Sequence, residues 1–288
     1  MPPISAAAPV PGQPVALQSA CDVSATVFTF GGAPPPTGSR AVAVEAAVNV
    51  VYGTVPYAVM MLTPADLEDF AAGFSLTEGV IGAREDLRGV TVVQEEDGMR
   101  LVVDLVPSRF HGLLSRRRAM AGRTSCGVCG IEDLANLPRA GQRQGPAAPV
   151  RLAAIRRALG ELSAHQVLNQ ATRAVHAAAW AGPDGAITCV REDVGRHNAL
   201  DKLIGALLTR GEDPGSGFLL VTSRCSYEMV EKAAAFGAGT LAAISAPTSL
   251  GVERAQHHGI TLVGVARHDA VTAFTGASRI ICDERILA

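Results

Sequence analysis

Hydrophobic and polar positions follow two different patterns along the chain. In the first half, short runs of aliphatic and β-branched residues are separated by glycine turns, which is typical of hairpins. The segment 41–63 predicts two strands that turn at Gly53, and the segment 90–106 predicts a hairpin that turns at Asp97 and Gly98. In the second half, short apolar runs alternate with amphipathic stretches, which predicts an α/β layer with partly parallel strands.

Helices are expected where apolar residues recur at helical spacing. In the first half, Thr63 is expected to cap a helix, with Pro64 in its first position, Asp66 completing the capping pattern and Gly79 ending it. A second, short helix is expected at 108–122. In the second half, the expected elements are helices at 151–164, 194–211, 226–237 and 249–259, strands at 217–223, 240–246 and 260–266, and a hairpin at 174–190.

These patterns predict an α/β protein, α+β overall, with two domains. Residues 1–39 form a flexible Pro/Ala-rich tail and lead-in, and residues 40–137 form a smaller hairpin-rich N-terminal domain. Residues 138–150 are expected to be a linker. Residues 151–288 then form the C-terminal α/β domain.

The composition excludes several classes of protein. The chain is 48% hydrophobic and 18% charged, with a net charge of −2 and a pI near 6.4, so nothing in its charge favours nucleic acid or an anionic membrane. No apolar run reaches the length of about 18 residues that a membrane span needs, and the N-terminus lacks the basic region of an export signal. Four of the six cysteines are scattered singly, which favours a reducing cytoplasm over a secreted disulfide framework. The six are Cys21, Cys126, Cys129, Cys189, Cys225 and Cys282.

The close pair Cys126 and Cys129, in "GRTSCGVCG", permits three kinds of chemistry. Structural zinc would need two further ligands, and the adjacent candidates His257 and His258 are neighbours in a predicted helix that point in different directions. A thioredoxin-type pair would normally lie between a strand and a helix. A sulfur-transfer thiol needs cations or N–H groups that lower its pKa, and Arg123 is the closest of several preceding arginines. The spacing alone leaves a metal site and sulfur chemistry about equally supported.

A second group of polar residues marks the ends of predicted strands. Arg196 and His197 begin the helix in "REDVGRHNALDKLIG", a position that suits an anion. Ser223 and Arg224 follow a buried strand, and "ARHDA" at 266–270 follows another. Ligands of α/β layers bind beyond the carboxyl ends of strands, so these segments could line one cleft for a phosphate-bearing ligand.

Structural roles explain part of the same group equally well. Asp193 can cap the following helix, and Asp201 and Lys202 can each pair with a charged residue one helical turn away. These roles would need no ligand.

Taken together, the motifs resemble one known family. "AGRTSCGVCG", "EDVGRHNALDKLIG", "SRCSYEMVEKAA" and "ITLVGVARHDAVTAFT" occur in the order typical of the formate dehydrogenase accessory sulfurtransferases (FdhD), and the resemblance spans roughly residues 40 to 276. It implies a cytidine-deaminase-like α/β domain with a smaller N-terminal domain, and a cytoplasmic homodimer. It also implies a protein that accepts sulfur from a cysteine desulfurase. The sulfur would be delivered to the molybdenum cofactor of formate dehydrogenase, bis-molybdopterin guanine dinucleotide.

The resemblance also implies roles for single residues. Cys126 would carry the persulfide and Cys129 would assist or resolve it, with no intrinsic metal. The cofactor-contacting loop would comprise Val265, Ala266, Arg267, His268, Asp269 and Ala270. The residues singled out from the sequence patterns themselves, Arg123, Arg196, His197, Ser223 and Arg224, would add supporting contacts. The alternatives are a non-catalytic chaperone that holds the cofactor, a zinc-stabilised adaptor, and, with less support, a thiol–disulfide oxidoreductase.

Overall fold

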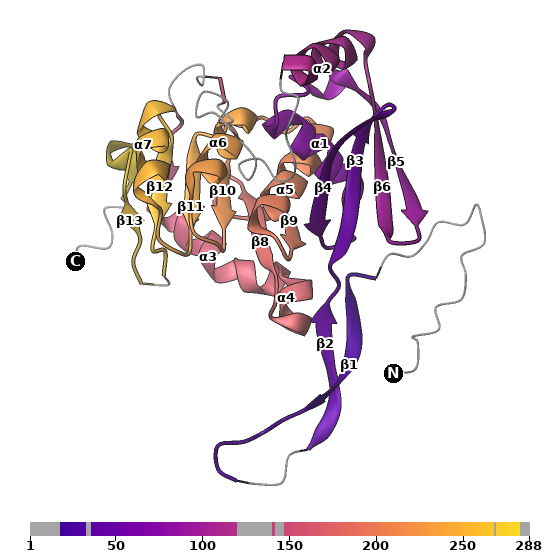
Figure 1. The fold of residues 1–288 in the computed structure, drawn as a ribbon. Coiled ribbons are helices and arrows are strands. Elements are labelled where there is room, and N and C mark those ends of the chain that lie inside the picture. Colours follow the sequence, from indigo (N-terminus) through magenta and orange to yellow (C-terminus); the bar gives the residue numbers. More distant parts are fainter. Residues whose placement is uncertain (1–17, 33–35, 120–139, 142–146, 268, 283–288) are drawn as a thin grey trace.

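In the described part of the chain, six strands form one mixed sheet at the centre of the C-terminal domain (Figure 1). The computed structural model describes residues 18–32, 36–119, 140–141, 147–267 and 269–282, and of residues 115–119 only the backbone. The strand order is β13-β12-β11-β10-β8-β9, in which β10, β11 and β12 are parallel and the other three are added antiparallel. The strands are β8 (His176–Ala181), β9 (Ile187–Asp193), β10 (Phe218–Val221), β11 (Thr240–Ala243), β12 (Thr261–Gly264) and β13 (Thr272–Ala273).

Side chains alternate between the two faces of this sheet, as the period of a strand requires. On one face, Leu220 and its neighbours on β8 and β11 pack against Ile155 and Leu162 of α3. On the other face, Leu219 and Trp180 join a larger core that includes residues of α5, α6 and α7. The helices of this domain are α3 (Leu152–His165), α4 (Val167–Thr172), α5 (Arg196–Arg210), α6 (Tyr227–Phe236) and α7 (Ser249–His257).

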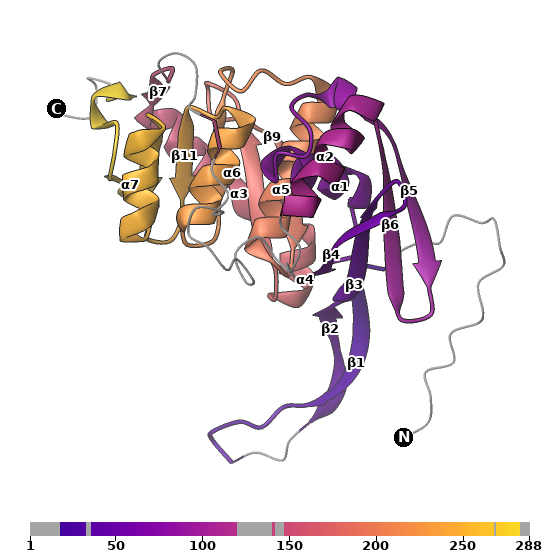
Figure 2. The same cartoon turned by 45° about the horizontal axis from the view of Figure 1, so that its top comes forward.

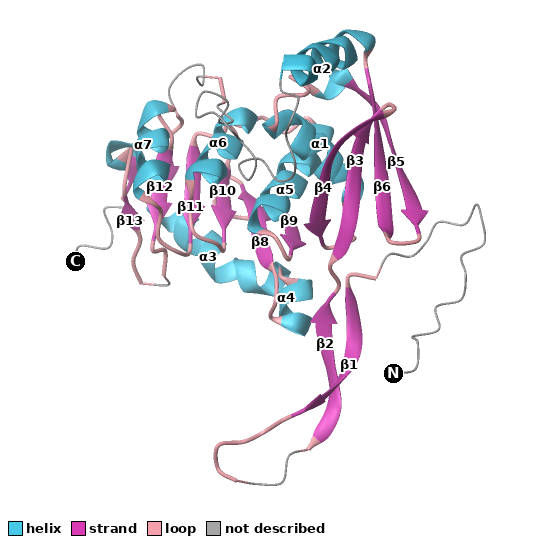
Figure 3. Ribbon diagram, in the orientation of Figure 1, coloured by secondary structure: helices cyan, strands magenta, loops and turns pink. Residues whose placement is uncertain are grey.

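The N-terminal domain is a second sheet with the order β4-β3-β6-β5 (Figure 3). Two hairpins, β3–β4 and β5–β6, are joined by the parallel pairing of β3 with β6. Both predicted hairpins are confirmed: Gly53 turns the first with a φ of 60°, and Gly98 pairs with Glu95 across the second. The elements are β3 (Ala46–Tyr52), β4 (Val55–Leu62), α1 (Leu67–Thr77), the 3-10 helix η1 (Arg84–Asp86), β5 (Leu87–Glu95), β6 (Gly98–Leu105) and α2 (Pro107–Ala119).

The two domains meet where α1 crosses α5, and two glycines allow the close approach (Figure 2). A Cβ atom on Gly73 would lie 1.8 Å from the carbonyl oxygen of Asp201, and one on Gly205 would lie 1.8 Å from that of Asp69. The backbones of the two helices are therefore in direct contact, and only residues without a side chain fit there. The hydrophobic core continues across this contact from the N-terminal sheet to α6.

The lead-in to the N-terminal domain differs from the flexible segment that the sequence predicts. Strands β1 (Ala20–Thr26) and β2 (Thr37–Ala43) pair along seven residues each and form an arm that extends away from both domains (Figure 1). Part of the segment that the sequence predicts to be loose, Thr37 to Ser39, belongs to β2. Two large apolar side chains of the connection are exposed, Phe28 and Phe30. Both strands of the arm contact α4 of the body.

The first helix starts later than its sequence predicts. Asp66, not Thr63, is the residue before the first turn, and it adopts a left-handed φ of 52°, which aspartate tolerates better than most residues. Thr63 is instead fully buried, and its hydroxyl accepts a hydrogen bond from the backbone N–H of Val194. Gly79 ends the helix as predicted, with a φ of 65°.

The remaining predicted elements of the C-terminal domain are confirmed, with small shifts of their bounds. Helix α4 and a short parallel pair, β7 (Val150–Arg151) with β14 (Ile280–Ile281), were not expected, nor was the 3-10 helix η3 (Ala277–Arg279). The predicted linker 138–150 is described only in part. Among the helices of the described segments, none is both long and apolar enough to cross a membrane.

Candidate functional site

The carboxyl ends of the three parallel strands form one polar edge of the central sheet. The segments that follow β10, β11 and β12 are joined by hydrogen bonds: Ile244 N–H donates to Val221 O over 3.0 Å, and Val265 N–H donates to Ser245 O over 3.2 Å. Strand β8 begins at the same edge, because Ala177 bonds to Thr222 in both directions. The predicted meeting of the segments at 222–225 and 265–270 is therefore found, with residues 244–248 between them.

The loop after β12 is strained at its first residue. Val265 has a φ of 50°, a conformation that β-branched residues rarely adopt. The surrounding contacts hold it there, since Ala266 N–H bonds to Ala243 O and Arg267 N–H closes a turn onto Ala270 O over 2.8 Å. Arg267 also donates from Nη1 to Ile244 O over 2.5 Å. Strain of this kind collects at functional sites, where the surroundings compensate for its cost.

Basic groups gather at the same edge, around the start of α5. Burial, followed by the nearby charges of Arg196 and His197, lowers the pKa of His176 at the start of β8. Within the described residues, two buried polar atoms of this region have no hydrogen-bond partner, Nε of Arg196 and the hydroxyl of Ser226. A buried donor without a partner is costly, so these atoms fit a bound acceptor such as a phosphate or carboxylate group. Arg224 adds an exposed positive charge.

Two other residues of this edge are unsuited to bind or react. Ser223 is buried, and its hydroxyl donates to the carbonyl oxygen of Arg224 over 3.1 Å. The thiol of Cys225 is fully buried, and burial raises its pKa to about 12. Because the thiolate is the reactive form, Cys225 is not a nucleophile at neutral pH.

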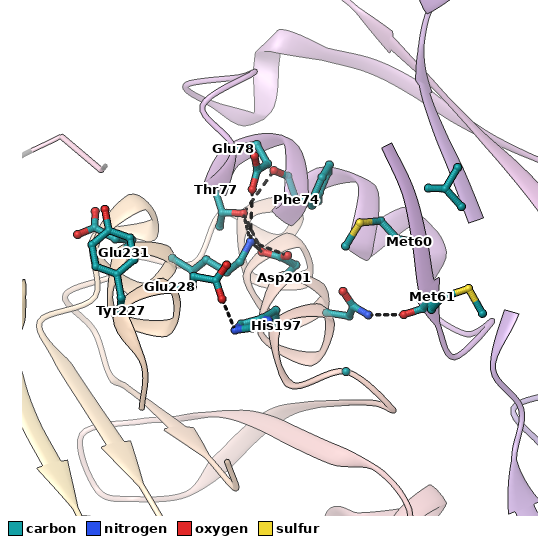
Figure 4. Close-up of a pocket in the computed structure, with 14 residues that line it drawn as sticks. Met60, Met61, Phe74, Thr77, Glu78, His197, Asp201, Tyr227, Glu228 and Glu231 are labelled. Atoms are coloured by element: carbon teal, nitrogen blue, oxygen red, sulfur yellow. Dashed lines mark hydrogen bonds and ion pairs between the residues drawn. The ribbon is translucent and has the colours of Figure 1, made fainter. Parts of the chain in front are cut away.

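A cavity of about 480 Å³ lies between the two domains, separate from the residues that form the polar edge except near His197 (Figure 4). Apolar side chains of β4 and α1 line one side, and polar side chains of α5 and α6 line the other. His197 Nε2 lies 2.8 Å from Glu228 Oε2, and Lys232 Nζ lies 2.8 Å from Asp201 Oδ2. The lining residues are Val59, Met60, Met61, Phe74, Thr77, Glu78, Gly195, His197, Asn198, Asp201, Tyr227, Glu228, Glu231 and Lys232.

Carboxylates outnumber cations in this cavity. Burial lowers the pKa of Lys232, but Asp201 and Glu78 beside it raise it more, so Lys232 stays protonated. The hydrogen bond from His197, working against burial, lowers the pKa of Glu228. Burial raises the pKa of Glu78. A phosphate would meet this set of carboxylates at close range, so the cavity is unsuited to it.

Arg196 and His197 lie between the strand edge and the cavity, because the charges of both lower the pKa of His176 at the edge and that of Glu228 in the cavity. His197 pairs with Glu228, whereas Nε of Arg196 has no partner among the described residues. Sequence reasoning missed the acidic side of the cavity. Its signal was the spacing of Glu228, Glu231 and Lys232, which places the three on neighbouring turns of one helix.

The remaining predicted site residues lie outside the described residues. They are Arg123, Cys126, Cys129 and His268.

The described fold and edge define a class: an α/β protein of two main sheets with a basic, strained strand edge and an acidic cavity at the junction of β4, α1, α5 and α6. A sequence model of the FdhD/NarQ family matches residues 43–281, and the chain belongs to that family. The resemblance seen in the motifs is thereby confirmed.

Similar proteins span most of the chain. "Sulfur carrier protein FdhD" of Bordetella petrii is 46% identical over 85% of this chain and 88% of its own length. The protein of the same name from Cupriavidus necator is 48% identical over 83% of each. The fold is similar to that of a formate dehydrogenase accessory protein from Desulfotalea psychrophila, with a TM-score of 0.71 and 24% identity over 92% of this chain and all of the other.

Proposed function

We propose that this protein is a sulfurtransferase that takes sulfur from a cysteine desulfurase and delivers it to the molybdenum cofactor of formate dehydrogenase. The observation that carries the proposal is the similarity, over 83–90% of the chain, to proteins named sulfur carriers. The polar edge supports it independently, because it offers cationic groups to an acceptor that bears pyrophosphates.

The first step of the proposed reaction is a sulfur transfer between thiols. The thiolate of Cys126 attacks the outer sulfur of the donor's persulfide, a new S–S bond forms, and the donor cysteine leaves as a thiolate. Cys126 then carries one additional sulfur, and no net oxidation has occurred. Arg123 is three residues away in the sequence, and in this proposal its charge favours the Cys126 thiolate.

The second step releases the sulfur to the acceptor. The thiolate of Cys129 attacks the sulfur of Cys126, so that the outer sulfur leaves as sulfide and binds the cofactor. The two cysteines are left as a disulfide, which a thiol reductant reduces before the next cycle.

The proposed binding place of the acceptor, bis-molybdopterin guanine dinucleotide, is the polar edge. Its pyrophosphates would accept hydrogen bonds from Arg196 Nε and Ser226 Oγ, which have no partner among the described residues. Arg224 and Arg267 would add charge. The backbone of the loop from Val265 to Ala270 would complete the contact, and the strained φ of Val265 would fix the direction of the loop. The protein would act in the cytoplasm as a homodimer, with no role for nucleic acid or a membrane.

The test compares the wild type with Cys126→Ala and Cys129→Ala. After incubation with a cysteine desulfurase and cysteine, intact mass and peptide mapping should show one added sulfur on Cys126 of the wild type. Cys126→Ala should carry none and should leave formate dehydrogenase inactive in cells, while Cys129→Ala should load sulfur but deliver it poorly. Full activation of formate dehydrogenase by Cys126→Ala would instead identify a chaperone that only holds the cofactor.

A further inference from the structure

The cavity formed by β4, α1, α5 and α6 holds more negative charge than its cations neutralise. Three of its carboxylates share one lysine: burial lowers the pKa of Lys232, and the charges of Asp201, Glu78 and Glu228 raise it. Asp201 occupies this lysine most fully, because its two oxygens lie 3.0 and 2.8 Å from Lys232 Nζ. Glu78 and Glu228 are therefore left with less compensation than Asp201.

Glu78 is the carboxylate that its surroundings compensate least. Its side chain is 14% exposed, and its one ion-pair partner in the described part of the chain, Lys232 Nζ, is 3.9 Å away. Tyr57 donates a hydrogen bond to Glu78, yet burial still raises the pKa of this carboxyl, and the charges of Asp201 and Glu228 raise it further. A buried carboxylate in this state carries an energetic penalty, which a cation beside it would remove.

Glu228 reaches the same space from α6, whereas Glu78 reaches it from the end of α1 (Figure 4). Oε2 of Glu228 lies 2.8 Å from His197 Nε2, and Oε1 has no hydrogen-bond partner within the described residues. The remaining carboxylate of the lining, Glu231, is already paired with Arg254 at 2.5 Å. A ligand that enters the cavity therefore meets two carboxylates with unused capacity to accept hydrogen bonds.

The rest of the lining includes an apolar wall with an aromatic face. Met60 and Phe74 line the cavity and are almost fully buried in the protein. The face of the Phe74 ring already attracts a cation, because Lys232 Nζ lies 5.7 Å from the centre of the ring. This wall suits the apolar body of a ligand or a second cation.

The lining excludes other classes of ligand. No three metal-binding side chains of the described residues lie close enough together to hold a metal ion. An anion would be repelled by the carboxylates, and a neutral molecule would remove water from them without supplying a counter-charge. A cation that carries several N–H donors and an apolar body satisfies both parts of the lining.

We propose that this cavity binds a small organic cation, a primary amine or a guanidinium on an aliphatic or aromatic body, with Glu78 and Glu228 as its counter-ions. The volume of about 480 Å³ is within the range of small-molecule sites. The proposal goes beyond sulfur transfer and does not depend on it.

Three probes of nearly equal size isolate the effect of charge. 2-Phenylethylamine carries a cation, 2-phenylethanol replaces it with a neutral hydroxyl, and 3-phenylpropionate replaces it with a carboxylate. Titration calorimetry of the full-length protein at neutral pH should give an affinity for the amine at least about tenfold above that for the alcohol. 3-Phenylpropionate should bind more weakly than either. Methylamine, which lacks the apolar body, should bind at least about tenfold more weakly than 2-phenylethylamine.

Glu78→Gln and Glu228→Gln remove the two counter-ions one at a time. Each should weaken the binding of 2-phenylethylamine by about tenfold or more and leave that of 2-phenylethanol within about twofold. Glu68→Gln is the matched control, because Glu68 is exposed in the first turn of α1 and does not line the cavity. Glu78→Gln relieves a buried charge, so its thermal unfolding midpoint should not fall, and a loss of binding then cannot result from a loss of the fold.

Several results would overturn the proposal. Equal affinities for the amine and the alcohol would identify an apolar cavity that does not select charge. If Glu78→Gln and Glu68→Gln bound the amine equally well, the amine would lie elsewhere, and no binding at about 10 mM would exclude the site outright.

Pyrophosphate tests whether the cavity is separate from the polar edge. An anion at the edge should leave the affinity for the amine unchanged or raise it, because it would offset the charges of His197 and Arg196 that act on Glu228. Displacement of the amine by pyrophosphate would show that both ligands use one site and would overturn the proposal.

Discussion

Asp193 and Lys202 form a buried ion pair that holds a residue of the other domain. Asp193 Oδ2 and Lys202 Nζ lie 2.6 Å apart, and neither side chain has exposed surface. Both also bind the backbone of Thr63: its N–H donates to Asp193 over 2.9 Å, and its carbonyl accepts from Lys202 over 2.8 Å. The strand that leads from the N-terminal sheet to α1 is thus fixed to the C-terminal domain at one charged point.

Asp193→Asn should therefore destabilise the whole protein. Removing one partner leaves the Lys202 charge buried without compensation, which costs about 3–5 kcal/mol at neutral pH. Burial already lowers the pKa of Lys202 against the effect of Asp193, and the loss of that carboxylate lowers it further. Because the folded pKa of Lys202 lies below the ordinary 10.5, the buried lysine loses its proton as the pH rises toward 10.5, and the cost of burying its charge disappears. The loss of unfolding free energy in Asp193→Asn should therefore shrink between neutral pH and about 10.

Urea unfolding at several pH values measures this effect. Glu161→Gln is the control, because its partner Arg157 and Glu161 itself are exposed and the pair should contribute little. A loss below 1 kcal/mol in Asp193→Asn at pH 7, or one that grows toward pH 10, would contradict the assignment.

Two glycine substitutions in helices should have opposite effects on stability. Gly205→Ala would place a Cβ 1.8 Å from the carbonyl oxygen of Asp69 and must push α1 away from α5, so we expect a loss of about 3 kcal/mol or more. Gly160→Ala in α3 meets no atom within 4 Å and should stabilise by about 0.5–1 kcal/mol, because alanine favours a helix. Thermal unfolding of both variants is the measurement. If Gly205→Ala and Gly160→Ala changed the stability equally, the packing of α1 on α5 would not depend on the close approach at Gly205.

Much of the fold could be predicted because its elements repeat simple patterns. The helices and strands of the C-terminal domain follow from periods of 3.6 and 2, and both N-terminal hairpins follow from glycine turns. The arm formed by β1 and β2 could not be found in this way, because its strands bury little surface and Val23 and Phe28 stay exposed. The start of α1 was misjudged because Thr63 is held by contacts with a distant part of the chain.

The candidate site was predicted less completely, for a related reason. The parallel strand ends had to meet, so the polar edge could be expected from the topology. Asp193, Asp201 and Lys202 were assigned to caps and local pairs. The structure adds partners from distant segments, such as Thr77 for Asp201 and Thr63 for the other two. Long-range contacts of this kind leave no periodic trace in a sequence.

Cys225 should resist alkylation in the folded protein. Its thiol is fully buried with a pKa of about 12, so iodoacetamide at pH 8 should label the exposed Cys21 and Cys282 but reach Cys225 only after unfolding in urea. Peptide mass spectrometry separates these sites. Because the folded pKa lies above the ordinary 9.0, the folded state holds the thiol proton more tightly. Its contribution to stability is therefore present below about pH 9 and lost as the pH rises toward 12. Native labelling of Cys225 at the rate of Cys282 would contradict this burial.

Arg196→Gln should weaken the binding of a diphosphate group at the polar edge. Nε of Arg196 has no hydrogen-bond partner among the described residues, and the charges of Arg196 and His197 add to burial in lowering the pKa of His176. Both observations favour a bound anion, and losing one charged hydrogen bond should weaken the affinity for pyrophosphate by about tenfold. The matched control is Arg156→Gln, because this arginine is exposed on α3, the helix on the opposite face of the sheet. Titration calorimetry at two salt concentrations measures the effect, and higher salt should weaken wild-type binding more than that of Arg196→Gln. Binding that the two variants weaken equally would reflect the general charge of the protein and would remove the polar edge as the binding place of the cofactor.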